Sequence, residues 1–234
     1  MDAMEAVAEQ QREYMREAER SGLDYIGPCP AHLAEAWIEI PLPNGRTNRT
    51  RVVWPRSSHV PGSNKCPLVV YMHGGGYYTC SPDLVLAPAR GFAQVLGAVV
   101  ACPTLDQLPG QSFPAPIQAA WEVCAWLSDA ANLNDGLLKR EGIAVDLSRG
   151  FVVGGVSSGG TAAAVISALY AAASAGKPGY AQPNPIKAPF TGAFVGLPFL
   201  VTEQMLPEEY KGQLLSRRDA ERTAYLEALI GTYL

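Results

Sequence analysis

The chain has 234 residues, of which 48% are hydrophobic and 17% are charged, with a net charge of −4. This length predicts one domain, residues 1–234, with a substantial hydrophobic core. An acidic chain with no basic run cannot neutralise a phosphate backbone, which excludes a nucleic-acid-binding protein. No apolar stretch approaches the roughly 18–20 residues that a membrane-spanning helix needs, so we expect no membrane span.

The N-terminus and the cysteines indicate a cytoplasmic protein. Residues 1–5 are acidic and show neither the basic nor the apolar segment of a secretory signal. The cysteines are scattered, odd in number and without C-x-x-C spacing, which is typical of reduced thiols; they are Cys29, Cys66, Cys80, Cys102 and Cys124. We therefore expect no disulfide framework, no metal site and no cofactor.

The first third of the chain predicts a helix followed by a hairpin. Residues 1–22 carry apolar side chains every three or four positions, which predicts a helix. That helix either packs its apolar stripe on the body of the protein or contributes a lid over a ligand pocket. After a turn at 27–30, strands are predicted at 36–40 and 50–54, joined through Pro43-Asn44-Gly45.

The remainder alternates buried strands with helices. Continuous apolar runs at 66–72, 97–102 and 150–154 predict strands covered on both faces, and 194–197 predicts another. Helices are predicted at 84–96, 115–128 and 158–175, a surface loop at 176–185, and a polar helical segment beyond residue 207. This alternation predicts an α/β fold with a mostly parallel central sheet and helices on both faces.

One candidate site lies where a predicted strand meets a predicted helix. The sequence Gly155-Val156-Ser157-Ser158-Gly159-Gly160 fits G-x-S-x-G in the strand-to-helix context that this motif requires. A nucleophile on so tight a turn has a strained backbone, so the small residues Gly155 and Gly159 must flank it. The helix N-terminus beneath Ser157 favours developing negative charge. The alternative is a glycine-rich turn without chemistry.

A second motif follows the predicted strand at 66–72. In His73-Gly74-Gly75-Gly76-Tyr77, consecutive glycines let backbone N–H groups point at one place, as an oxyanion hole requires. A phosphate-binding loop is the rival interpretation, but no Gly-Lys-Ser/Thr follows. In this setting His73 is expected to brace the loop by hydrogen bonding and not to act as a base.

Together the two motifs identify a family resemblance. HGGG at 73–76 and G-x-S-x-G at 155–159 resemble the hormone-sensitive-lipase-like branch of the α/β-hydrolases, a carboxylesterase family. Three further stretches agree with that pattern, and the resemblance spans about residues 35–205; the stretches are Phe113-Pro114-Ala115-Pro116, Trp126-Leu127 and Asp146-Leu147-Ser148-Arg149. It implies an α/β-hydrolase fold with a core at 31–205, a cap region at 1–30 and a helical, cap-like or C-terminal segment at 206–234.

The resemblance also implies roles for individual residues. Ser157 would be the acylated nucleophile, and the N–H groups of Gly75, Gly76 and Ser158 would bind the oxyanion. Four residues would support this site: His73, Gly74, Gly155 and Gly159. Tyr77 and Tyr78 either line the substrate pocket or serve ordinary packing.

The sequence departs from the family pattern after the serine. In that family an acid and then a histidine follow the nucleophile, whereas here His32, His59 and His73 all precede Ser157. Asp219 is the only later aspartate, and its charged surroundings indicate a solvated helix face. We therefore expect a C-terminally truncated chain that lacks the last strands and is inactive or impaired, because a serine without a base is a weak nucleophile.

Two smaller departures surround the predicted site. Val156 occupies the position before the nucleophile, where many relatives carry aspartate. Residues 104–110, Thr-Leu-Asp-Gln-Leu-Pro-Gly, replace the family's D-Y-R-L-A-P-E stretch. Since that stretch supports the glycine loop in the family, we expect a looser oxyanion loop.

Three hypotheses follow. The first is a serine esterase acting on small or medium carboxylic esters, present here in truncated form. The second is a non-catalytic protein that binds a small molecule in the same pocket. The third is a fragment whose sheet another chain completes, through a partner or a homo-oligomer, because an open apolar edge invites pairing.

Overall fold

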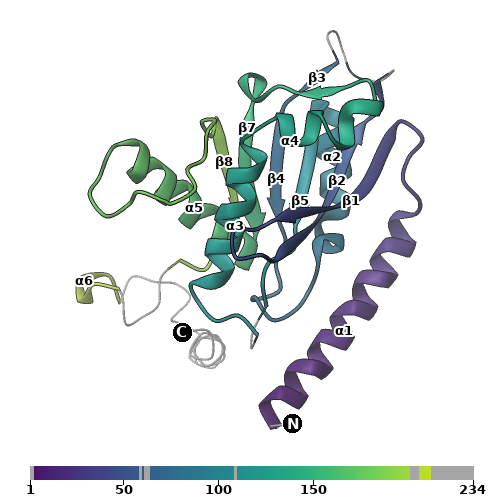
Figure 1. Cartoon of the computed structure of the whole chain (residues 1–234). Helices are drawn as coiled ribbons and strands as arrows, with labels where there is room; N and C mark the ends of the chain where they lie inside the picture. Colours follow the sequence, from purple (N-terminus) through teal and green to yellow (C-terminus); the bar gives the residue numbers. More distant parts are fainter. Residues whose placement is uncertain (1–2, 58–59, 61–63, 108–109, 201–205, 212–234) are drawn as a thin grey trace.

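The computed structural model describes residues 3–57, 60, 64–107, 110–200 and 206–211. Within these residues a central sheet runs through the molecule (Figure 1). Its strands, in spatial order, are β1 (Leu33–Pro41), β2 (Thr47–Pro55), β5 (Val99–Pro103), β4 (Leu68–Met72), β7 (Phe151–Val156) and β8 (Gly192–Gly196). β5, β4, β7 and β8 are parallel, and β1 and β2 form an antiparallel extension. The predicted mostly parallel sheet is confirmed.

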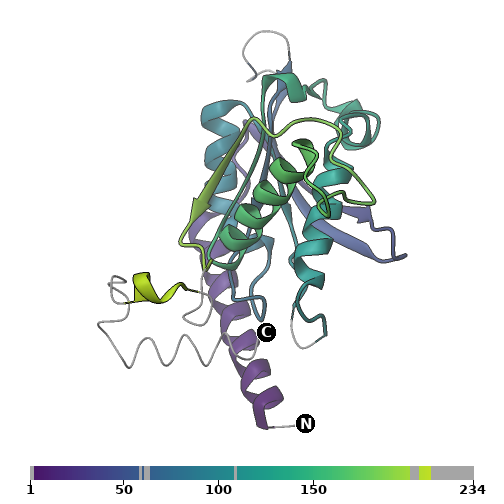
Figure 2. The same cartoon turned by 90° about the vertical axis from the view of Figure 1, so that its left-hand side faces the viewer.

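Helices cover both faces of this sheet, as predicted (Figure 2). On one face, α3 (Ala115–Leu127) and α5 (Ser158–Ser174) share a core with β4, β5 and β7. On the other face, α2 (Leu86–Leu96) and the C-terminal end of α1 (Ala3–Ile26) pack against β2, β4 and β5. Most of α1 extends beyond the body of the molecule (Figure 1).

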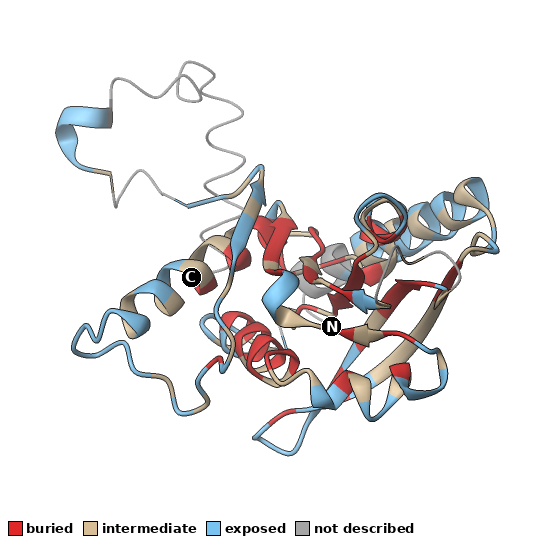
Figure 3. Ribbon diagram, turned by 90° about the horizontal axis from the view of Figure 1, so that it is seen from above, coloured by how far each residue is buried: buried red, intermediate tan, exposed pale blue. Residues whose placement is uncertain are grey.

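The buried residues gather between these layers and the exposed ones lie at the periphery (Figure 3). Near the β8 edge, the ring of Phe194 crosses Gly154 of β7, where a Cβ atom would lie 2.2 Å from the ring. The same ring contacts Tyr71 at 5.0 Å and Phe92 at 5.3 Å between centroids. Glycine at 154 thus allows an aromatic cluster that joins β8, β4 and α2.

Most predicted elements are present, with one error among the strands. The predicted hairpin is an antiparallel β1–β2 pair, in which Leu33 lies opposite Pro55. The single strand predicted at 66–72 is wrong, because Pro67 has no N–H and interrupts the ladder. It divides the run into β4 and the short β3 (Lys65–Cys66), which pairs with β6 (Ala144–Val145) in a separate sheet.

Several short elements were not predicted. They are η2 (Pro82–Val85), α4 (Ala131–Asn134), η3 (Leu137–Arg140) and η4 (Leu147–Arg149). Gly97, predicted to begin a strand, instead ends α2 in a left-handed conformation with φ of 62°. One-turn elements are too short for hydrophobic periodicity to reveal them.

The predictions for the end of the chain are tested only in part. Of the helical segment predicted beyond residue 207, the described residues contain α6 (Glu208–Lys211). Asp219 lies outside the described residues, as does His59. The domain boundaries stay a prediction. All five cysteines are free thiols, as expected. In the portion that the structure describes, no helix has the length and apolarity to cross a membrane.

Candidate functional site

The two motifs meet at the carboxyl edge of the parallel sheet. β4 and β7 are neighbours, and Met72 pairs with Gly155 in their register. The chain leaves β4 at His73 and leaves β7 at Ser157, so the glycine loop and the candidate nucleophile emerge side by side. Contact between them is direct, because a Cβ atom on Gly74 would lie 3.1 Å from the Cβ of Ser157.

Ser157 sits on a strained turn between β7 and α5. Its φ of 55° and ψ of −122° fall in a region that residues with side chains rarely adopt. The surroundings hold this conformation, since the Ser157 N–H donates to the carbonyl of Gly196 at 2.8 Å. The residue itself is exposed to solvent. A strained backbone thus presents an accessible hydroxyl at the sheet edge.

Both flanking glycines are required by packing. A Cβ atom on Gly155 would lie 2.3 Å from the backbone of Gly159. One on Gly159 would lie 2.3 Å from the carbonyl oxygen of Met72 and 2.4 Å from that of His73. These backbone contacts cannot yield as a flexible side chain would. The first turn of α5 therefore packs directly on the end of β4.

The glycine loop turns tightly after His73. Gly75 has φ of 118°, and a Cβ atom there would lie 2.1 Å from the carbonyl oxygen of Thr79. That contact belongs to a turn in which the N–H groups of Tyr78 and Thr79 both donate to the Gly75 carbonyl at 3.0 Å. Gly76 also has positive φ, at 62°. Successive residues of this kind form backbone concavities that bind anions through N–H groups.

His73 braces this loop from below. Its Nδ1–H donates to the carbonyl of Gly74 at 2.6 Å, and its Nε2 accepts from the N–H of Leu105 at 3.1 Å. Burial lowers the pKa of His73 to about 4, so the ring is neutral at neutral pH. With both nitrogens engaged by backbone groups, His73 has no atom available for proton transfer to Ser157.

Residues 104–107, which depart from the family pattern, still tie the loop to the body. Beyond the Leu105 bond to His73, the Gln107 side chain donates to the carbonyl of Cys80 at 2.6 Å. Asp106 in turn forms a two-bond ion pair with Arg46 at the β1–β2 hairpin, at 2.6 and 2.9 Å. The sequence offered no signal for the contribution of Gln107 beyond its place in this segment. Different residues thus provide support where looser support was expected.

Tyr77 and Tyr78, predicted either to line a pocket or to pack, lie in different surroundings. Tyr77 is buried, and its hydroxyl donates to the carbonyl of Ser158 at 2.8 Å. Tyr78 is half-buried. Ser158 is buried, and its side-chain oxygen has no hydrogen-bond partner. The Tyr77 contact joins the glycine loop to the first residue of α5, a link that sequence spacing could not reveal.

The described residues place no available histidine beside Ser157. His32 precedes β1, and the pairing of Leu33 with Pro55 puts it at the opposite, amino edge of the parallel strands. His73 is engaged as described above. In the described ranges, no group of three or more histidine, cysteine or acidic side chains is placed to hold a metal ion.

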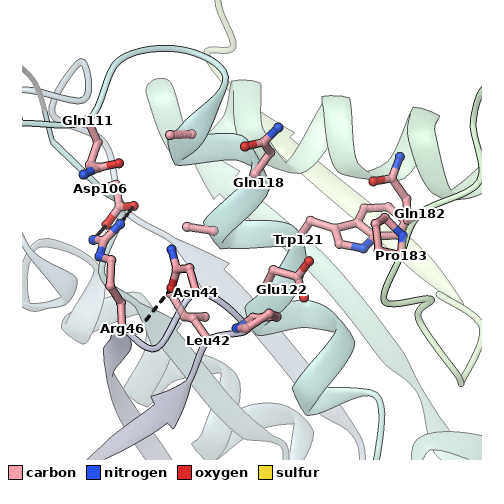
Figure 4. A pocket seen from close by; sticks show the side chains of 13 residues that line it. Leu42, Asn44, Arg46, Asp106, Gln111, Gln118, Trp121, Glu122, Gln182 and Pro183 are labelled. Atoms are coloured by element: carbon pink, nitrogen blue, oxygen red, sulfur yellow. Dashed lines mark hydrogen bonds and ion pairs between the residues drawn. The ribbon is translucent and has the colours of Figure 1, made fainter.

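Two cavities lie outside the motif contact. One, of about 260 Å³, is lined by polar and apolar side chains of the β1–β2 hairpin, α3 and the 182–183 loop, among them Asn44, Gln118 and Trp121 (Figure 4). The other, of about 150 Å³, lies between α1 and η2 and is lined mainly by apolar side chains, including Met15 and Leu84. Neither lining includes Ser157 or the three glycines.

Both motif regions fall within the part of the chain that a family model matches. A family model described as an alpha/beta hydrolase fold matches residues 69–228. Esterase LipI of Mycobacterium tuberculosis is 29% identical over 166 residues, which cover 71% of this chain and 45% of LipI. Carboxylesterase 20 of Arabidopsis thaliana is 30% identical over 133 residues, which cover 56% of this chain and 36% of the relative. The chain thus spans less than half the length of either relative.

A solved structure shows the same architecture. The crystal structure of vibralactone cyclase superposes with a TM-score of 0.69 at 21% identity, covering 95% of this chain and 62% of the cyclase. At 21% identity this match shows a shared fold and nothing further. Because the family match extends over more than half of the residues and agrees with the observed sheet, the chain belongs to the α/β-hydrolase fold family.

Proposed function

We propose that the chain carries the nucleophile and the oxyanion hole of a carboxylic ester hydrolase. The observation that carries the proposal is the contact of the glycine loop with the strained turn at Ser157, at the sheet edge where β4 and β7 end. Family membership and the carboxylesterase names of the relatives support the same chemistry. Small to medium carboxylic esters are the proposed substrates, as in the sequence-based hypothesis.

In the proposed reaction, Ser157 Oγ attacks the ester carbonyl carbon and loses its proton to a base. The carbonyl oxygen becomes negatively charged and accepts hydrogen bonds from the N–H groups of Gly75, Gly76 and Ser158. As this intermediate collapses, the protonated base returns the proton to the departing oxygen, which leaves as the alcohol. The acyl group remains on Ser157, and water then hydrolyses it to the carboxylic acid. Gly74 and His73 hold the loop, and Gly155 and Gly159 allow the turn.

The described residues do not place a base beside Ser157. We therefore propose that the 234-residue chain by itself turns over slowly, since serine is weakly nucleophilic without an adjacent base. Added imidazole offers a base in solution. We expect imidazole to raise the rate of p-nitrophenyl acetate hydrolysis above the sum of the imidazole and protein rates, and Ser157→Ala to abolish this excess.

Labelling of Ser157 tests the proposal most directly. A fluorophosphonate probe reacts with a serine that a base activates and whose oxyanion is stabilised, so in the presence of imidazole the protein should be labelled and Ser157→Ala should not. Ser148→Ala, which changes an exposed serine on η4, is the matched control and should be labelled like the wild type. Labelling that is absent even with imidazole, or that persists in Ser157→Ala, would contradict the proposal.

The engaged state of His73 and the lack of another histidine near Ser157 in the described part favour one second candidate. In that case the site binds a small molecule without turning it over. Isothermal titration with acetate and butyrate, together with an ester hydrolysis assay, separates the two functions. Saturable binding without imidazole-dependent hydrolysis would favour the binding protein, and hydrolysis dependent on Ser157 would exclude it.

The expectation that another chain completes the sheet stays a prediction. In the described part of the chain β8 is an edge strand, and apolar side chains are exposed there and just beyond it: Val195, Leu197, Phe199 and Leu200. An exposed apolar strand edge favours pairing with another strand. Light scattering that reports only monomers at micromolar concentration would contradict a homo-oligomer.

A further inference from the structure

We propose that Tyr77 is a positioning residue that sets the spacing between the two halves of the oxyanion hole; this inference rests on the proposed function. Tyr77 directly follows Gly76, so its backbone continues the glycine loop. Its hydroxyl donates a 2.8 Å hydrogen bond to the carbonyl of Ser158, 81 positions later in the chain. The Tyr77 side chain thus connects Gly75 and Gly76, which offer two of the proposed N–H donors, with Ser158, which offers the third.

The backbone of Tyr77 is held in an unfavourable conformation. Its φ of 62° continues the positive values of Gly75 and Gly76, at 118° and 62°. For a residue with a side chain, a left-handed conformation is unfavourable because the Cβ atom crowds the following carbonyl oxygen. Such a conformation persists only where the surroundings enforce it. Here Tyr77 is 5% exposed and belongs to the main hydrophobic core, which anchors the end of the loop.

The Tyr77 hydroxyl fixes an orientation that neither the Gly159 contact nor the Ser158 side chain fixes. Contact of Gly159 with the ends of Met72 and His73 fixes how closely α5 approaches β4. The Ser158 side-chain oxygen is buried without a partner and so does not hold its own residue in place. A hydrogen bond in a buried setting is directional, since its strength falls steeply with misalignment. The bond from Tyr77 therefore orients the Ser158–Gly159 peptide relative to the loop, and this peptide directly follows the one that carries the Ser158 N–H.

Tyr77→Phe removes this hydroxyl and keeps the ring. With imidazole present, we expect the covalent step of fluorophosphonate labelling of Ser157 to slow about tenfold, with the half-saturating probe concentration unchanged, because loss of the hydroxyl displaces the oxyanion donors and leaves the ring beside them in place. Tyr25→Phe, which changes a tyrosine that is 93% exposed on α1, should label at the wild-type rate. A purely structural role would lower the melting temperature without slowing the covalent step.

Amide hydrogen exchange tests the role of Tyr77 independently of the proposed function. In Tyr77→Phe, exchange should accelerate in peptides covering 74–79 and 157–161 and stay unchanged in 119–125 of α3. If the wild type is not labelled at all, the proposed function fails, and this exchange pattern decides whether Tyr77 positions the loop. Wild-type exchange in both peptides, or acceleration throughout the chain, would overturn the inference.

Discussion

The imidazole of His73 is enclosed at the end of β4, with one nitrogen donating to Gly74 and the other accepting from Leu105. Protonation would place a donor against the Leu105 N–H and a charge in the core. The folded protein therefore binds this proton less readily than the unfolded chain, whose histidine pKa is near 6.5.

This difference predicts a pH dependence of stability. Because the folded pKa is about 4, the unfolded state binds more protons between pH 4 and pH 6.5, and the free energy of unfolding falls as the pH is lowered through this range. The loss amounts to about 3 kcal/mol. His73→Gln should be less stable than wild type at pH 7, and the difference should narrow toward pH 4 in urea unfolding. His32→Gln is the control. If the difference in stability between His73→Gln and wild type stays constant with pH, this account is wrong.

A second prediction at this scale concerns the turn at Ser157. Gly155→Ala would drive a methyl group into the backbone of Gly159, which cannot move without displacing α5. We expect a loss of about 3 kcal/mol in the free energy of unfolding. Gly91→Ala, in α2 with open space around its Cα, should instead stabilise the protein slightly. Equal melting temperatures for the two variants would show that the turn is not tightly packed.

Among the elements, α1 is tied to the body by hydrogen bonds in its C-terminal half. Its Glu19 carboxylate accepts from the N–H of Ser81 at 2.7 Å and from the Ser81 hydroxyl at 3.0 Å. Ser81 follows Cys80, whose Cβ would lie 3.0 Å from a Cβ atom on Gly75. The contact between helix and loop therefore reaches the segment that supports the candidate oxyanion hole.

Removing this anchor should free α1 and leave the core unchanged. In Glu19→Ala we expect amide hydrogen exchange to increase at least about tenfold across α1, because local opening replaces two hydrogen bonds with water. The melting temperature should change little. Glu17→Ala, an exposed glutamate on the same helix, should exchange like wild type. Unchanged exchange in Glu19→Ala would show that apolar contacts alone hold the helix.

At the scale of the whole molecule, buried charges join elements that are distant in the sequence. Glu35 of β1 accepts from Arg51 of β2 at 2.6 Å and from Arg90 of α2 at 2.7 Å. Arg51 also contacts Asp83 of η2 at 2.5 Å, and Arg90 donates to the carbonyl of Gly27 after α1. The Glu35 side chain is only 7% exposed, so little water reaches this carboxylate.

Loss of this carboxylate should destabilise the entire fold. Glu35→Gln leaves two arginines partly uncompensated, and removing one partner of a buried ion pair costs about 3–5 kcal/mol. We expect a cooperative loss of that size in urea unfolding. Glu39→Gln, an exposed glutamate on the same strand, should change the free energy of unfolding by less than about 0.5 kcal/mol. A loss below 1 kcal/mol in Glu35→Gln would mean that the arginines find other partners.

The sequence by itself determined the family, the alternation of strands and helices and the two motifs, because these depend on local hydrophobic pattern and on glycines that only certain turns accept. Only the tertiary structure decided that Pro67 divides a strand, which backbone groups His73 contacts, and that Tyr77 reaches Ser158. Each of these depends on which backbone groups meet across the sheet. Residue spacing along the chain carries no information about contacts between residues that are far apart in sequence.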